Sequence, residues 1–180
     1  MSKPHHDADP GAIEESGSKE RYRLKPRAFN IVWGNDSRYW RIPPRSTTPS
    51  DNDEFAELVQ VSWLEVTGLV KQLNTSTSYK LTFKLSFKSD AFGWSGCPVF
   101  LMAKVGKNGR YKWKRLKDLE VLPKEPIIVP RDDDPFVIDV PTLTDQPDNK
   151  LYFGLYEVWS GKWKGGLRVH EAIVKEIKKQ

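Results

Sequence analysis

The sequence predicts an all-β fold, an antiparallel β-sandwich of the jelly-roll kind. In run after run of the 180-residue chain, apolar and polar residues alternate with a period of two. Proline, glycine and asparagine separate these runs, as they do between strands. At least eight such runs occur without an internal repeat, which is typical of a sandwich.

The clearest strand is "YKLTFKLSFKS", residues 79–89. Every second position is apolar, and the positions between are lysine, threonine or serine. The apolar face consists of Tyr79, Leu81, Phe83, Leu85 and Phe87. Five alternations in a row predict a half-buried strand with one face in water.

Further strands are expected along the chain. "AFNIVW" (28–33) places Phe29, Ile31 and Trp33 on one face, and residues 106–109, "GKNG", predict a hairpin turn between two runs. "PFVIDV" (135–140) alternates regularly. "KLYFGLYEVW" (150–159) is apolar on both faces, which predicts a central strand, and "GLRVHEAIVKEI" (166–177) closes the chain.

Residues 55–66, "FAELVQVSWLEV", alternate less cleanly. The apolar parity changes near Trp63, which predicts a β-bulge there. Trp63 shares its parity with two preceding valines and is therefore expected in the core. A helical start over residues 54–58 is a weaker alternative.

Residues 1–25 contain mainly glycine, serine, proline, histidine and charged residues. With so few apolar side chains, this segment is not expected to bury enough surface to offset its conformational entropy. The sequence therefore predicts a disordered tail over residues 1–25, dispensable for folding, and one domain over residues 26–180.

The composition limits which cellular compartment and which binding partners are expected. The net charge of +5 is mild and the lysines are scattered, so a nucleic-acid partner is not expected. Cys97 is the only cysteine, which excludes an intrachain disulfide and predicts a small buried or half-buried packing residue in a reducing compartment. No apolar run approaches the roughly 20 residues that span a bilayer, and the first 20 residues lack the apolar core of a signal peptide. We expect a cytoplasmic protein without a membrane partner, with the nucleus open to a chain of this size.

Enzyme and metal motifs are scarce. No nucleophile elbow, phosphate-binding loop, zinc-protease helix or dinucleotide fingerprint is present. His170 is expected to be a solvated or core histidine. Asp132–Asp134 lacks the alternating spacing of a calcium loop, and the cluster of His5, His6 and Asp7 has no further ligand nearby. The sequence therefore predicts no catalytic residue, no metal and no cofactor.

Tryptophan is the outstanding residue type, with seven copies: Trp33, Trp40, Trp63, Trp94, Trp113, Trp159 and Trp163. An indole is a flat apolar plate with one donor, and the C–H face of a sugar ring can stack on it. Trp33 and Trp40 flank a polar loop that contains Asn35 and Asp36, whose side chains could bond sugar hydroxyls. Alternation alone leaves open that either ring is packed in the core.

Three stretches resemble one known family. "RAFNIVWGNDSRYW", "AELVQVSWLEVTG" and "LYEVWSGKWKGGLRV" are similar, in order and spacing, to the phloem protein 2 or Nictaba-type (tobacco agglutinin-related) lectins of plants. The resemblance extends from about residue 26 to the C-terminus, and the short tail without an F-box resembles the A subgroup. It implies a nucleocytoplasmic β-sandwich lectin without catalysis, a homodimer in several members, that binds N-acetylglucosamine oligomers or N-glycan cores.

The resemblance also implies site residues. The two binding tryptophans of the family correspond to Trp33 and Trp40, which favours a surface position for Trp40. An acidic family residue corresponds to Glu157, and the W-K-x-G motif begins at Trp163. Lys150 departs from the family pattern, because it replaces a carboxylate and reverses its charge.

The resulting hypothesis is that Trp33 and Trp40 stack on sugars while Asn35, Asp36 and Glu157 bond hydroxyls or the acetamide. One alternative is a protein- or RNA-interaction module on the same sandwich that has lost sugar binding. The other is a glycoside hydrolase, which needs two facing carboxylates where only Glu157 is placed.

Overall fold

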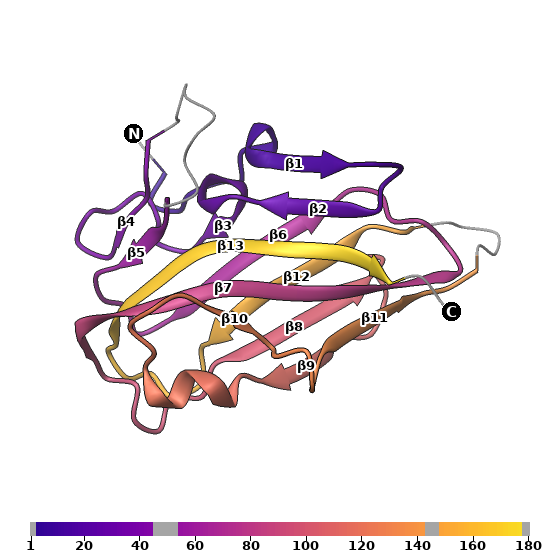
Figure 1. Ribbon diagram of the computed structural model, residues 1–180. Helices are drawn as coiled ribbons and strands as arrows, with labels where there is room; N and C mark the ends of the chain where they lie inside the picture. The colour runs from indigo at the N-terminus through magenta and orange to yellow at the C-terminus, as the bar shows by residue number, and fades with distance from the viewer. Residues whose placement is uncertain (1–2, 45–53, 143–147, 178–180) are drawn as a thin grey trace.

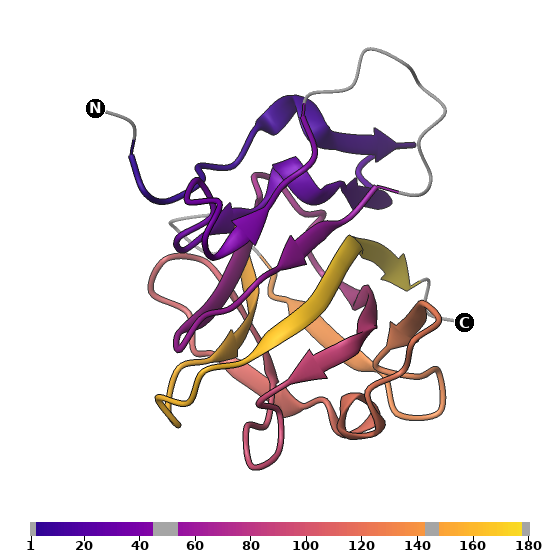
Figure 2. The same cartoon turned by 90° about the vertical axis from the view of Figure 1, so that its left-hand side faces the viewer.

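The computed structural model describes residues 3–44, 54–142 and 148–177. In this part of the chain, two antiparallel sheets pack face to face with the core between them, which confirms the predicted β-sandwich (Figures 1 and 2). No helix within these ranges is long and apolar enough to cross a membrane.

The five-stranded sheet has the order β3-β6-β12-β8-β9. Its strands are β3 (Asn30–Ile31), β6 (Leu64–Val70), β12 (Leu151–Glu157), β8 (Phe100–Val105) and β9 (Lys112–Arg115). The central position of β12 and the hairpin turn between β8 and β9 are as the sequence predicts.

The eight-stranded sheet is built on the pairing of two long strands, β7 and β13. One path through it runs β1-β2-β13-β5-β4, and β7 also pairs with β10 and β11. The strands are β1 (Ile13–Ser16), β2 (Arg21–Leu24), β4 (Trp40–Arg41), β5 (Ala56–Leu58), β7 (Thr77–Phe92), β10 (Ile127–Val129), β11 (Phe136–Val140) and β13 (Gly165–Ile177). Short 3₁₀ helices lie at η1 (Pro10–Ala12), η2 (Pro26–Ala28) and η3 (Lys117–Val121).

The predicted apolar face of β7 forms the centre of the core. All five of its alternating residues are at most 1% exposed. Phe83 of β7 lies 5.8 Å from the ring of Phe153 in the opposite sheet, and Phe29 stacks on Phe83 at 5.7 Å. Aromatic contacts of this kind add to simple area burial, so these rings hold the two sheets together.

The parity change near Trp63 is a crossover between sheets, not a β-bulge. β5 belongs to the eight-stranded sheet and β6 to the five-stranded one, so residues 59–63 pass from one to the other. The core lies below one sheet and above the other, so the alternation of buried and exposed residues is interrupted where the chain passes from β5 to β6. Trp63 is 45% exposed, and its Nε1 donates to Glu65. The prediction that Trp63 is a core residue is therefore wrong, as is the helical alternative.

The N-terminal segment packs on the sandwich, so the prediction of a disordered tail is wrong for residues 3–25. β1 and β2 form a hairpin, and β2 pairs with β13. Leu24 is fully buried, and the Tyr22 hydroxyl donates to the Gln72 carbonyl. The prediction from composition was wrong because β2 forms its backbone hydrogen bonds with β13, a strand of the sandwich. Such a strand needs few apolar side chains of its own.

Trp40 is also placed differently from the prediction. It is 2% exposed, belongs to the core and lies opposite Leu58 in the β4–β5 pair. Its Nε1–H has no acceptor among the described residues. Trp40 is therefore a packing residue and not a surface plate, because β4 turns it toward the space between the sheets.

We predict that Trp40→Ala lowers the free energy of unfolding by about 3–5 kcal/mol, because it leaves a large cavity. Trp63→Ala is expected to cost about 1 kcal/mol or less, as surface substitutions do. Urea denaturation of both variants measures the two values. A Trp40→Ala protein as stable as Trp63→Ala would contradict the burial of Trp40.

Candidate functional site

Four loops meet at one end of the sandwich, the end that faces the viewer in Figure 2. The register of the five-stranded sheet brings them there, since Ile31 pairs with Val66, and the ends of β12 pair with the starts of β6 and β8. We call this the aromatic end. Its loops carry Trp33, Trp63, Trp94, Trp159 and Trp163.

Three rings at this end form a connected surface that we call the aromatic shelf: Trp33, Tyr39 and Trp163. The ring of Tyr39 lies 5.7 Å from that of Trp33 and stacks on Trp163 at 6.2 Å. Both indoles are exposed, whereas Tyr39 is half-buried. The Arg38 guanidinium lies over Tyr39 at 5.2 Å. The shelf therefore offers two exposed indoles fixed through one central ring.

Tyr39 takes the place that the sequence hypothesis gave to Trp40. Tyr39 lies in the turn before β4, and its half-buried ring contacts Trp33 and Trp163, whereas Trp40 of β4 points into the core. Because residues in a turn do not follow strand alternation, no parity argument from the sequence identifies Tyr39. Trp33 and Trp163 are exposed, so the faces of both indoles are open to a ligand.

Trp33 has a φ of +66°, which is rare for a bulky side chain. Its N–H donates to Nδ1 of His5 at 2.9 Å, and the His5 ring lies edge-on to the indole at 5.0 Å. A Cβ on the next residue, Gly34, would lie 2.7 Å from Cβ of His6. Residues 3–9, which we call the N-terminal strap, therefore hold Trp33 in this conformation.

The two polar side chains predicted to bind a ligand also shape this loop. Asn35 donates through Nδ2 to the carbonyls of Lys3 and His5 and so fastens the strap. Asp36 accepts from the Arg38 N–H and forms an ion pair of 2.7 Å with its guanidinium. Hydrogen bonds from Arg38 lower the pKa of the Asp36 carboxyl. Asp36 and Arg38 thus form a charged rim beside the shelf.

His6 joins the strap to the five-stranded sheet. It exchanges two backbone hydrogen bonds with Ile31, and its Nδ1 donates to the Phe29 carbonyl at 2.8 Å. Nε2 is buried without a partner among the described residues. Burial lowers the pKa of His6 below its ordinary value of 6.5, and the nearby Arg27 charge acts in the same direction.

We predict that the strap makes stability depend on pH. Below pH 6.5 the unfolded chain takes up a proton at His6 that the folded protein, with its lowered pKa, does not. The free energy of unfolding should therefore fall as pH decreases through this range. His6→Asn keeps a donor for Phe29 and does not titrate, so it should lose less stability between pH 7.5 and pH 5. Equal losses in parallel urea titrations would contradict this role.

Glu157 does not lie on the surface, which contradicts the expectation that its carboxylate bonds a sugar. It is fully buried and forms an ion pair of 2.7 Å with Lys164, also fully buried. Lys164 donates in addition to the carbonyls of Ser62 and Lys162. Glu157 and Lys164 therefore position the loops at the aromatic end, whereas the sequence hypothesis placed Lys164 in the W-K-x-G motif without a role.

We predict that Lys164→Met lowers the free energy of unfolding by about 3–5 kcal/mol, because it leaves the Glu157 carboxylate buried and unpaired. The double variant Glu157→Leu/Lys164→Met should recover much of this loss, since a buried ion pair can be replaced by apolar residues. Chemical denaturation of the three proteins measures the coupling. Additive losses would show that the two residues do not act as a pair.

Lys150 lies far from the shelf. It precedes β12, whereas Glu157 is the last residue of that strand. Seven residues of extended chain separate them by roughly 23 Å. The reversed charge at Lys150 therefore cannot act on a ligand that is held at the aromatic end.

The other sequence candidates have separate structural partners. Asp132 pairs with Lys80, Asp133 with Arg131 and Asp134 with Lys114. Cys97 is buried, as predicted. His170 contacts Ser86 through Nε2. Within the described ranges, no group of three or more His, Cys, Asp or Glu side chains could hold a metal ion.

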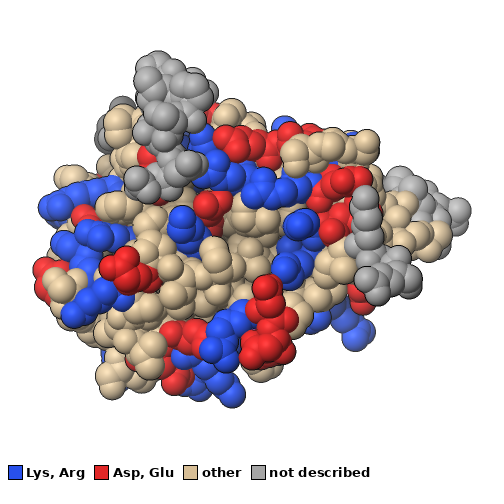
Figure 3. Space-filling model, in the orientation of Figure 1, with Lys and Arg blue, Asp and Glu red and all other residues tan. Residues whose placement is uncertain are grey.

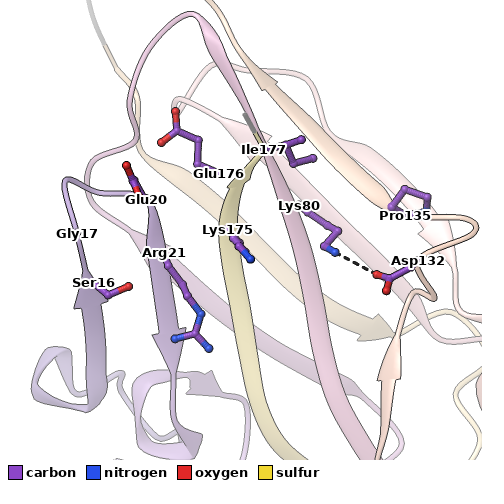
Figure 4. Close-up of a pocket in the computed structure, with 10 residues that line it drawn as sticks. All are labelled: Ser16, Gly17, Glu20, Arg21, Lys80, Asp132, Pro135, Lys175, Glu176 and Ile177. Carbon is purple, nitrogen blue, oxygen red and sulfur yellow. Dashed lines mark hydrogen bonds and ion pairs between the residues drawn. The ribbon is translucent and has the colours of Figure 1, made fainter. Parts of the chain in front are cut away.

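A hollow of about 700 Å³ lies on the outer face of the eight-stranded sheet (Figure 4). Residues of both charges line it, including the ion pair of Lys80 and Asp132 at 3.0 Å. None of its lining residues is aromatic. Figure 3 shows the same mixture of charges across this face. The hollow therefore has no aromatic ring on which a ligand could stack, and no net charge of one sign that would attract an ionic ligand.

Comparisons with known proteins agree on one family. A family model described as Phloem protein 2 matches residues 19–175. Protein PHLOEM PROTEIN 2-LIKE A9 of Arabidopsis thaliana is 44% identical over 96% of this chain and 96% of its own length. A protein named lectin from Luffa acutangula is 30% identical over 46% of this chain and 40% of its own.

A solved structure supports the fold alone. The crystal structure of a GH26-CBM35 β-(1,4)-mannanase from Podospora anserina aligns with 89% of this chain and 28% of its own, with a TM-score of 0.51 and 6% identity.

Proposed function

This chain belongs to the phloem protein 2 family, and we propose that it is a lectin that binds glycans at the aromatic shelf without catalysis. Relatives from Luffa acutangula and Coccinia grandis that are named lectins support this class of function. The observation that carries the site is the pair of exposed indoles, Trp33 and Trp163, fixed through Tyr39.

The chemistry of the shelf suits a sugar ring. The apolar C–H face of a pyranose can stack on an indole, and its hydroxyls can bond polar groups at the edge. Asp36 and Arg38 supply an acceptor and donors beside the shelf. We propose N-acetylglucosamine oligomers as ligands, because the acetamido methyl adds apolar contact with the rings.

The alternative of an RNA-binding module has less support. Stacking sites for nucleic acids accompany a basic groove, whereas the cation that lies over the ring of Tyr39, Arg38, is already paired with Asp36. Salt separates the two functions, since it screens phosphate contacts and leaves stacking almost unchanged. Binding of chitotriose that persists in high salt supports the lectin.

We predict that Trp33→Ala and Trp163→Ala each weaken the binding of chitotriose by about 2 kcal/mol or more, because each removes an aromatic anchor. Isothermal titration calorimetry measures the loss, and circular dichroism verifies the fold. Val121→Ala, at an exposed position of η3, is the matched control and should bind normally. Unchanged affinity in both tryptophan variants would refute the shelf as the site.

A further inference from the structure

A groove of about 590 Å³ lies on the outer face of the five-stranded sheet at the aromatic end. Phe100 and Met102 of β8, Trp113 of β9 and Trp159 line it. A volume of this size is typical of small-ligand sites. None of these four residues was assigned a role by the sequence hypothesis.

The two indoles of the groove are held in place yet largely exposed. The Phe100 ring lies 5.5 Å from that of Trp113 and 5.2 Å from that of Trp159, both in edge-to-face geometry. Trp113 is 63% exposed and Trp159 60% exposed. One buttressing ring therefore fixes two tryptophans whose surfaces remain open to a ligand.

The lining indicates an uncharged ligand. Glu157 is the one ionisable residue among those that line the groove, and its carboxylate is buried against Lys164 at 2.7 Å. The remaining lining is aromatic, thioether, proline and glycine, with the hydroxyl of Ser160. A neutral ring with an apolar face and a methyl group matches this surface better than a phosphate or a charged peptide.

The groove is separate from the aromatic shelf. β3, which leads into the loop of Trp33, lies at one edge of the five-stranded sheet, and β9, which carries Trp113, lies at the other. Three strand spacings between β3 and β8 amount to about 14 Å. A single sugar ring therefore cannot contact Trp33 and Trp113 together, although Trp159 and Trp163 belong to the same loop between β12 and β13.

We propose that this groove is a second carbohydrate site, which takes the pyranose ring of a neutral 2-acetamido sugar on Trp113 and Trp159. The choice of sugar rests on the proposed lectin function, whereas the groove itself rests on its own geometry. Two sites in one chain would allow a single protein molecule to cross-link glycans.

Titration of the full chain with N,N′-diacetylchitobiose, followed by the indole N–H signals in NMR spectra, tests the proposal. The signals of Trp113 and Trp159 should shift as one set and those of Trp33 and Trp163 as another, while buried Trp40 stays unchanged. Calorimetry should give two ligands per chain, reduced to one by Trp113→Ala or by Trp33→Ala. Cellobiose lacks the acetamido group, so the concentration that half-saturates the shifts of the groove signals should be at least about tenfold higher for it.

The outcomes distinguish the two proposals. Shifts confined to Trp33 and Trp163 would overturn the groove and leave the shelf in place. Shifts confined to Trp113 and Trp159 would support the groove and overturn the shelf. No shifts at all would overturn both. If sedimentation shows that the wild type is a dimer and Trp113→Ala a monomer, the groove is a self-association surface and the proposal is wrong.

Discussion

The buried ion pair of Glu157 and Lys164 is the constraint on which the aromatic end depends. Glu157 ends β12 of one sheet, and Lys164 immediately precedes β13 of the other, so their 2.7 Å contact ties the two sheets together. The backbone of Lys164 also exchanges two hydrogen bonds with Val61, in the crossover between β5 and β6. A buried ammonium is stable only when it is fully paired. Its partners therefore fix both crossover loops, and with them the tryptophans that these loops carry.

The aromatic shelf depends in turn on the N-terminal strap. Trp33 adopts a left-handed backbone conformation that costs free energy for such a side chain. Contacts with His5, and the close approach of His6 to Gly34, hold it there. The residues that support the ring thus come from a segment nearly 30 positions earlier, which composition alone assigns to a disordered tail.

Polar residues at this end mostly serve the protein itself. Asn35 fastens the strap, Asp36 bonds Arg38, and Glu157 neutralises Lys164. Loops have unpaired backbone and side-chain groups that must be satisfied before they can hold one shape. The loops leave the indoles of Trp33, Trp159 and Trp163 exposed, so the aromatic shelf is defined by rings and only edged by polar groups.

The sequence by itself determined the β-class, the buried face of β7, the central position of β12 and the family. These features follow from alternation within one strand or from motifs, which need no partner. Only the tertiary structure decided that Trp40 is buried, that Trp63 is exposed and that Tyr39 joins the shelf. Alternation gives relative parity along a strand, whereas the direction of the core is set by the sheet to which that strand belongs. Where the chain turns or crosses between sheets, as it does before Trp40 and at Trp63, alternation along the sequence no longer predicts which side chains point into the core.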